Sequence, residues 1–339
     1  MKGNKQNKKK SQKRKKNRIP YLLFLLLLTS MTLSVSSYAW FTTNRLVRID
    51  LLNVNVQTQG GIEISSDGTN WKAILSINDI INARETYPNS INQIPSTLEP
   101  VSSVGDLEDG KMKMFYGVVE NDVNGNYFLV AERNIEEESF DELSNGKFIA
   151  FDLFLKTSQP FQIYLTPESN ITYGGENSYG IENAMRIAFI HEGTTAIGSA
   201  LNTTQGLTTN QEENVYIWEP NYDIHTTHGI ENAKNVYGLN ITSPGQRVTY
   251  DGVSNEIAKN NKIKIQNANK ISYPNYFDTV DIDLATISNF ETNEEIFYLN
   301  SGISKYRVYM WIEGQDVDCE NNASVGNVSL NLQFTTNPA

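Results

Sequence analysis

Cysteine is nearly absent from this chain, which contains a single one, Cys319, among its 339 residues. One cysteine cannot build an internal disulfide framework, so stability must come from packing or from bound ions. Because an isolated cysteine usually behaves as a small apolar residue, we predict that Cys319 is buried rather than a nucleophile or an intermolecular bridge.

Recognisable catalytic motifs are also missing. The chain has three histidines and contains no His-Glu-x-x-His metalloprotease motif, no Gly-x-Ser-x-Gly elbow and no phosphate-binding loop. Paired carboxylates stay open as a possibility, since a glycosidase needs only two of them at the right separation in space. The sequence therefore predicts a protein that is not an enzyme and assigns it no cofactor.

Positive charge is scarce outside the first eighteen residues. Residues 2–18 hold ten of the 28 Lys and Arg and no acidic residue, which leaves 18 basic against 39 acidic residues, a net charge of −21, for the rest of the chain. So acidic a chain is repelled by a phosphate backbone. Nucleic acid is therefore excluded as an expected partner.

An uncharged apolar segment, residues 19–41, follows the basic residues 1–18. This order is the layout of an export signal, and the positive charge keeps the N-terminus in the cytoplasm. Small residues from Ser37 to Ala39 suit a signal peptidase, but the segment is also long enough to span a bilayer as an anchor helix. We expect residues 42–339 to form one extracellular domain, either released by cleavage near Ala39 or held at the membrane.

Alternation of apolar and polar residues predicts β-strands through much of this domain. It is clearest at residues 328–334 and 306–312, which we expect to pair as neighbours joined by an acidic loop. Residues 149–155 and 161–165 flank a Thr-Ser-Gln-Pro turn and predict a hairpin. Residues 185–189 predict another strand.

Shorter patterns complete this interpretation. Residues 47–56 alternate with a one-residue phase slip, which predicts a strand with a β-bulge. Residues 76–87 have helical spacing, residues 122–126 predict a hairpin turn, and residues 136–142 predict a charged, exposed face. Together the patterns predict an all-β fold, an antiparallel β-sandwich of the jelly-roll kind after one N-terminal signal or transmembrane helix.

Several blocks of sequence resemble segments of uncharacterised exported surface proteins of Gram-positive bacteria. These blocks are YAWF at 38–41, IAFDLFL at 149–155, NAMRIAF at 183–189, IWEPN at 217–221 and MWIEG at 310–314. More distantly, the signal layout and the expected fold resemble the TasA/camelysin group of secreted biofilm-fibre proteins. That resemblance implies a jelly-roll subunit that polymerises when its N-terminal strand fills a groove in the next subunit.

The first strand offers two possibilities after export. Cleavage near Ala39 would release residues 41–58 as a free segment with strand periodicity. Such a segment can complete the sheet of a neighbouring copy through backbone hydrogen bonds. It can equally pair within its own subunit, and a retained signal would then tether a monomer to the membrane.

Two groups of polar residues have the composition of ion sites. His225 and His228, with Glu219 and Asp223 nearby, could ligate zinc or a similar ion. The residues Asp316, Asp318 and Glu320 could hold calcium, although the defined calcium-loop pattern is not present. Solvated loops are the alternative for both groups.

Two classes of function remain. The first is an exported structural or adhesive surface protein, such as a fibre subunit that associates with itself. The second is a membrane-anchored module that binds a glycan or another ligand, because Trp218 and Tyr222 are expected in one loop with Glu219 and Asn221. Both classes place the protein outside the cell, at the surface or in the membrane of a Gram-positive type of bacterium.

Overall fold

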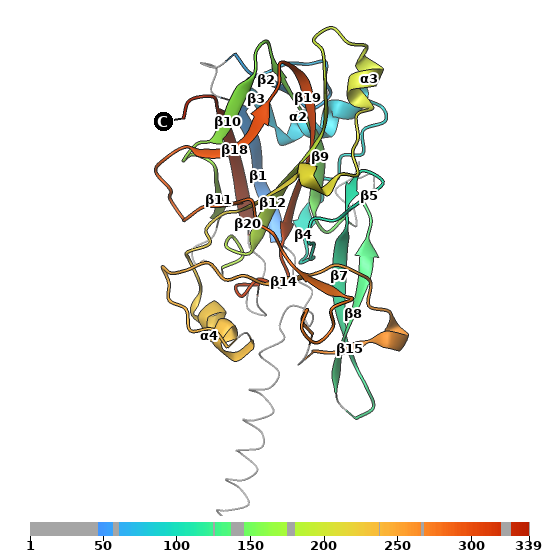
Figure 1. Cartoon of the computed structure of the whole chain (residues 1–339), viewed down its shortest axis with the longest axis vertical. Coiled ribbons are helices and arrows are strands. Elements are labelled where there is room, and N and C mark those ends of the chain that lie inside the picture. The colour runs from blue at the N-terminus through green and yellow to red at the C-terminus, as the bar shows by residue number, and fades with distance from the viewer. Residues whose placement is uncertain are drawn as a thin grey trace, which may run out of the picture.

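The computed structural model describes residues 47–56, 61–124, 126–136, 146–174, 180–236, 238–265, 268–319 and 327–338 (Figure 1). The predicted basic and apolar N-terminal segments lie outside this part of the chain, and so does Glu320. Among the described residues, no helix is both long enough and apolar enough to cross a membrane. The described chain is mostly β-structure arranged in several sheets.

Seven strands form the first sheet, here called sheet A, in the described part of the chain. Their order is β18-β10-β20-β1-β3, with β11 also paired to β20 and β4 to β1. The strands are β1 Val47–Val56, β3 Ile74–Ser76, β4 Thr97–Leu98, β10 Phe161–Leu165, β11 Asn170–Tyr173, β18 Glu294–Leu299 and β20 Asn327–Thr335.

The second sheet, sheet B, has six described strands in the order β17-β13-β12-β19-β9-β2. The strands are β2 Glu63–Ser65, β9 Ile149–Thr157, β12 Met185–Thr195, β13 Val215–Glu219, β17 Leu284–Ala285 and β19 Gly302–Ile312. β19 lies between β12 and β9, and all of its residues are buried. The central position predicted for residues 306–312 is confirmed.

Smaller strands and short helices complete the described chain. The remaining strands are β5 Leu107–Glu108, β6 Lys111–Met112, β7 Met114–Asn121, β8 Tyr127–Asn134, β14 Asp251–Val253, β15 Ile263–Lys264 and β16 Phe277–Thr279. The helices are α2 Ile77–Ile81, η3 Asn82–Glu85, α3 Leu201–Gln205, η4 Glu212–Asn214, α4 Thr227–Val236 and η5 Lys259–Asn261.

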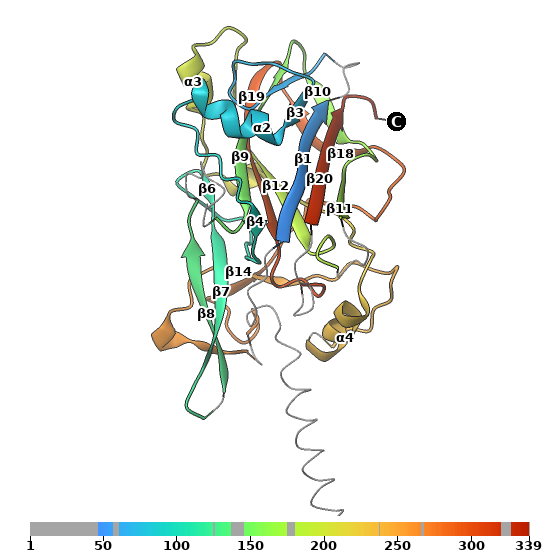
Figure 2. The ribbon, with the colours of Figure 1, turned by 180° about the vertical axis from the view of Figure 1, so that it is seen from behind.

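β1 occupies an interior position in sheet A. It lies parallel to β20 and antiparallel to β3 and β4, and Figure 2 shows β1 and β20 side by side. Its side chains Leu52 and Val54 are fully buried, as are Leu330 and Leu332 of β20. The pairing shifts register between residues 49 and 51, which confirms the predicted bulge.

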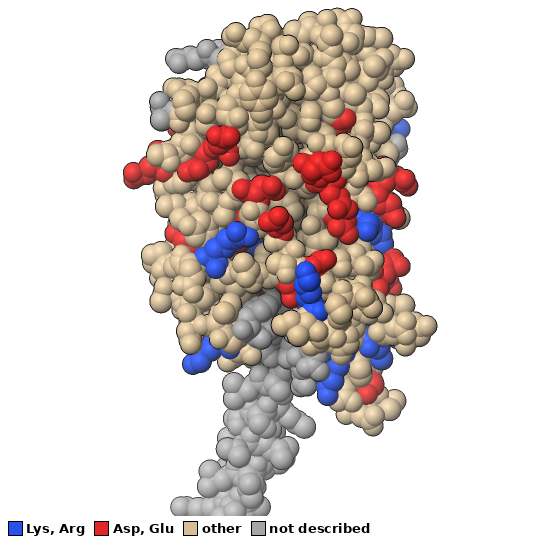
Figure 3. Space-filling model, viewed as in Figure 1, with Lys and Arg blue, Asp and Glu red and all other residues tan. Residues whose placement is uncertain are grey.

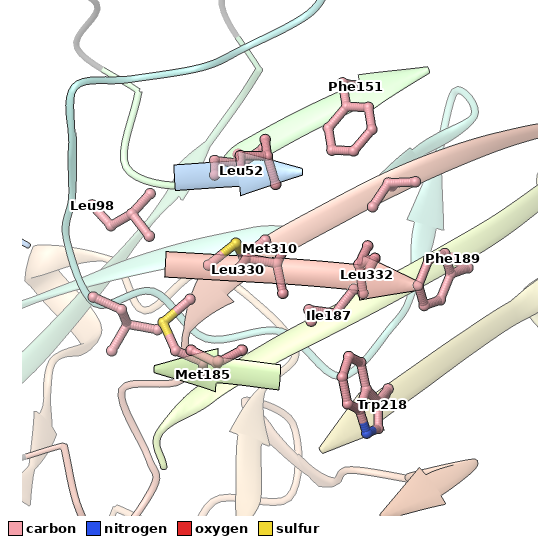
Figure 4. Close-up of a cluster of buried hydrophobic side chains, with 14 of the residues drawn as sticks. Leu52, Leu98, Phe151, Met185, Ile187, Phe189, Trp218, Met310, Leu330 and Leu332 are labelled. Carbon is pink, nitrogen blue, oxygen red and sulfur yellow. The ribbon is translucent and has the colours of Figure 1, made fainter. Parts of the chain in front are cut away.

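Sheets A and B share one hydrophobic core. Figure 4 shows Leu52, Leu330 and Leu332 of sheet A lying over Ile187 and Met310 of sheet B. Period-two alternation places the apolar residues of each strand on the face that meets the other sheet. Burial of this face is the main stabilising contribution that the strands make.

Strand pairing differs from the sequence prediction in two places. β19 belongs to sheet B and β20 to sheet A, so they are not neighbours. β9 and β10 also lie in different sheets, so residues 149–165 cross between the sheets and do not form a hairpin. Both errors have one physical reason, because strands on opposite sides of a core have the same apolar alternation. The alternation indicates which side chains are buried, but it does not indicate which strand is the pairing partner.

Several local predictions are confirmed. Cys319 is 2% exposed and belongs to the shared core. Asp122 closes the β7–β8 turn by accepting the backbone N–H of Asn126 at 2.9 Å. The predicted helix is α2 followed by the 3₁₀ turn η3, and Ser76 at its start donates its backbone N–H to Asp79 at 2.9 Å.

The outer face of sheet B is covered by a second apolar cluster. Phe148, directly before β9, packs there with Ile190 of β12 and Trp311 of β19 against Met112 and Met114 from β6 and β7. Networks of buried charged side chains border this cluster at both ends, around Arg186 and around Arg307. Sheet B therefore has one apolar face toward sheet A and one mixed face beneath loops.

The described surface reflects the acidic composition. In Figure 3, Asp and Glu side chains gather across the middle of the visible face, and Lys and Arg lie mainly lower. The upper part of that face has few charges of either sign. The positive groups do not merge into the continuous basic stripe that a phosphate backbone would require on this face.

Candidate functional site

One histidine and one aspartate proposed as metal ligands do come together. His225 Nδ1 lies 2.8 Å from Asp318 Oδ2, and the backbone N–H of Thr226 donates to Asp318 Oδ1 at 2.8 Å. Burial favours a lower pKa for His225, but the hydrogen bond and charge of Asp318 outweigh it and raise that pKa. The pair therefore joins the chain before α4 to the segment after β19.

The other proposed ligands point elsewhere. Asp316 Oδ2 accepts a hydrogen bond from buried Arg186 at 2.5 Å, and Glu219 binds the same guanidinium at 2.7 Å. His228 is exposed and lies 4.0 Å from Glu231. Within the described residues, no group of three or more His, Cys, Asp or Glu side chains is placed to hold a metal ion. Arg186 instead neutralises the carboxylates at this end of sheet B.

Trp218 does not lie in an exposed loop, contrary to the sequence prediction. It belongs to β13, is 1% exposed, and donates its indole N–H to Thr286 Oγ1 at 3.0 Å. Its apolar neighbours are core residues, because β13 extends sheet B beyond β12. Glu219 is also buried, and only Tyr222 and Asn221 remain partly exposed. Trp218 therefore presents no exposed aromatic face to a glycan, and glycan binding by the chain stays a prediction.

A charged cavity of about 330 Å³ lies on the outer face of sheet B. Asp152 of β9, Glu192 of β12, and Lys305 and Arg307 of β19 contribute to its lining. Arg307 binds Asp152 at 2.8 Å and Glu136 at 2.8 Å. The charges lie side by side because they occupy outward positions on three paired strands.

The cations of the charged cavity already have partners from the protein. The Lys305 ammonium lies 2.8 Å from Glu192 and 3.3 Å from Asp152. It also donates to the backbone carbonyls of Gln205 at 3.1 Å and Leu207 at 3.0 Å. The network therefore attaches the α3 segment to sheet B and leaves Lys305 no unsatisfied N–H.

The two neighbouring carboxyls of this network have opposite pKa shifts. Burial acts to raise the pKa of Asp152, but Arg307 and Lys305 outweigh burial and hold that pKa below its ordinary value. Burial and the charge of Asp152 raise the pKa of Glu192 to about 7. A carboxylate beside a carboxylic acid can in principle perform acid–base chemistry. Here both groups face the Lys305 ammonium, so we expect the main role of the arrangement to be structural: it holds the α3 segment against sheet B.

The sequence pattern did not predict this network, and it predicted the wrong environment for Glu136. Glu136 was predicted on an exposed face but is 7% exposed, because Arg307 and the hydroxyl of Tyr309 bind it. Residues 137–142 of that predicted face lie outside the described chain. A signal was present: Asp152, Lys305 and Arg307 interrupt two strongly apolar strands, and buried charges require partners.

A second cavity, of about 410 Å³, has a different lining, and we call it the amide cavity. It lies where β11, the residues before β12, the residues after β13 and the residues after β17 meet. Four asparagines line it: Asn170, Asn183, Asn221 and Asn289. The apolar part of the lining comes from Ile171, Tyr173, Ile224 and Phe290.

Comparisons with protein-family models, with curated proteins and with solved structures found no match. The topology and the two cavities are therefore the features that bear on function.

Proposed function

We propose that the chain is an exported cell-surface structural protein, a jelly-roll-like β-sandwich whose first strand can be exchanged between copies to build fibres. The observation that carries the proposal is the position of β1. It is the first described strand, yet it fills an interior slot of sheet A between β20 and the short strands β3 and β4.

The contacts of β1 are suited to exchange. Leu52 and Val54 are fully buried against the shared core, and the strand pairs with β20 over residues 48–56. A β1 strand from a second copy would make the same hydrogen bonds and bury the same side chains, so exchange costs few contacts. The predicted export signal directly before β1 supports its release as a free segment.

A cysteine pair can report which copy supplies the strand. Asn53 and Asn331 are cross-strand partners on the face of sheet A away from the core, and both are partly exposed. In the double variant Asn53→Cys with Asn331→Cys, opposed Cα atoms of adjacent strands lie in the range that a disulfide needs. We expect oxidised material from the cell surface to form ladders of covalent oligomers on non-reducing gels.

Each single-cysteine variant is the matched control and should give no ladder, because native Cys319 is buried. A double variant that forms the disulfide only within a monomer would reject strand exchange. Intact mass spectrometry of the same material gives its N-terminus. A chain that starts near Trp40 supports release, and an uncut chain extracted only by detergent supports a membrane-tethered monomer.

A further inference from the structure

We infer that the amide cavity binds an uncharged sugar residue of a glycan. This inference goes beyond the structural role proposed above and does not depend on it. Three properties of the cavity carry the argument: its unpaired amides, its lack of positive charge and its combination of polar and apolar lining.

The side-chain amide of Asn183 is the most informative of these groups. Asn183 is 6% exposed and lines the cavity, yet its amide makes no hydrogen bond to any described residue. Its amide atoms are not enclosed by protein, so they face the space of the cavity, where water or a ligand can bind them. A ligand in the cavity would supply the missing donor and acceptor.

The other asparagines extend this unpaired set. Asn170 and Asn289 are exposed at the rim, and their amides likewise make no hydrogen bond within the described chain. Asn221 donates its Nδ2 to the carbonyls of Ile171 at 3.3 Å and Glu182 at 3.4 Å, which orients the amide. Asn170, Asn183 and Asn289 therefore offer both donors and an acceptor, and Asn221 offers its Oδ1 as an acceptor, as adjacent hydroxyl groups require.

The charge of the lining narrows the ligand class. The described lining contains no Lys or Arg, and its one charged side chain is the carboxylate of Glu182. Phosphate and carboxylate ligands are normally held by Arg or Lys, so anionic ligands are disfavoured here. A neutral ligand with many hydroxyl groups fits the polar part of this site.

The apolar part of the lining and the cavity size fit the same class. Tyr173 and Phe290 contribute aromatic surface, and Ile287 at the rim is 44% exposed. A sugar ring has apolar C–H faces as well as hydroxyl edges, and it suits a site that combines both kinds of contact. A volume of about 410 Å³ is within the range of pockets that hold small ligands.

The test is an array of neutral, N-acetylated and anionic glycans probed with the intact protein, followed by titration calorimetry with the best neutral oligosaccharide. The variants are Asn183→Ala and Asn289→Gly. Asn289 has a φ of 56°, so glycine keeps the backbone conformation and removes only the amide. We expect each variant to weaken binding about three- to ten-fold, the loss of one neutral hydrogen bond.

Asn202→Ala is the matched control, because Asn202 is an exposed asparagine that lines the charged cavity instead. It should bind the same glycan with unchanged affinity. The inference is overturned if no neutral glycan binds, if anionic glycans bind best, or if Asn183→Ala and Asn289→Gly bind as well as the parent. Asn170→Ala, an exposed change, keeps the test decisive if Asn183→Ala does not fold. Failure of β1 exchange would not alter any of these results.

Discussion

The charged cavity and the amide cavity are similar in size, about 330 and 410 Å³. They differ in whether the protein itself supplies partners for the polar side chains of the lining. In the charged cavity, Lys305 and Arg307 have carboxylate and carbonyl partners from the protein itself. In the amide cavity, Asn183 is similarly buried, and its side-chain amide makes no hydrogen bond to a described residue. A polar cavity thus marks a binding site only when the protein leaves its hydrogen-bonding groups unused.

The difference follows from the chemistry of the two kinds of side chain. A buried charge without a partner lowers the stability of the folded state by several kcal/mol. Buried charged side chains are therefore expected to have partners from the protein. Leaving a neutral amide without a hydrogen-bond partner lowers stability far less. Such an amide can therefore remain free to bind a ligand. The charged cavity is accordingly expected to serve stability, and the amide cavity to serve recognition.

The largest expected effect separates the two cavities directly. Asp152→Ala and Asn183→Ala remove groups of similar size, a carboxylate and an amide, from side chains that are 3% and 6% exposed. Asp152→Ala leaves Arg307 and Lys305 without a shared carboxylate, so we expect the free energy of unfolding to fall by about 3–5 kcal/mol. Urea denaturation measures the change. A decrease of less than about 1 kcal/mol in the free energy of unfolding would show that the network does not stabilise the fold.

The pH dependence of stability gives an intermediate effect. Glu192 has a pKa of about 7 in the folded state against an ordinary value of 4.5, so between these values the folded state holds a proton that the unfolded state has lost. The free energy of unfolding should therefore fall as pH rises from 4.5 to 7, by at most about 1.4 kcal/mol per pH unit. Glu192→Gln should flatten this fall in denaturation curves. If the free energy of unfolding of Glu192→Gln falls with pH as steeply as that of the parent, Glu192 is not the group responsible.

The smallest expected effect belongs to the amide cavity. Because the Asn183 amide makes no described hydrogen bond, Asn183→Ala should change the free energy of unfolding by less than about 1 kcal/mol. The measurement is urea denaturation without added ligand. A loss comparable to that of Asp152→Ala would mean that the amide has a structural partner, and the contrast between the cavities would disappear.

Much of the fold could be predicted from local pattern. Alternation identified β9, β12, β19 and β20, and the phase slip in β1 identified its bulge. Pairing could not be predicted, because strands on either side of one core share the same alternation. The sheet to which β10 and β19 belong depends on contacts between distant segments, which periodicity does not encode.

The candidate sites were harder to predict for a related reason. Asp152 and Arg307 left a readable signal, since charges inside apolar strands must be paired. The amide cavity left none, because asparagines are common in loops and turns. Asn170, Asn183 and Asn289 become a group only after β11, the residues before β12 and the segment following β17 are brought together.

The parallel pairing of β1 with β20 also determines the order in which the fold can be completed. β1 is made before its partner β20, the last described strand, so a growing chain must present one open edge of β1 until β20 has been made. β3 can pair early with the other edge. Unpaired edges recruit other chains, and pairings between distant segments form slowly. A chaperone or a neighbouring copy would therefore meet β1 before its own C-terminal strand does.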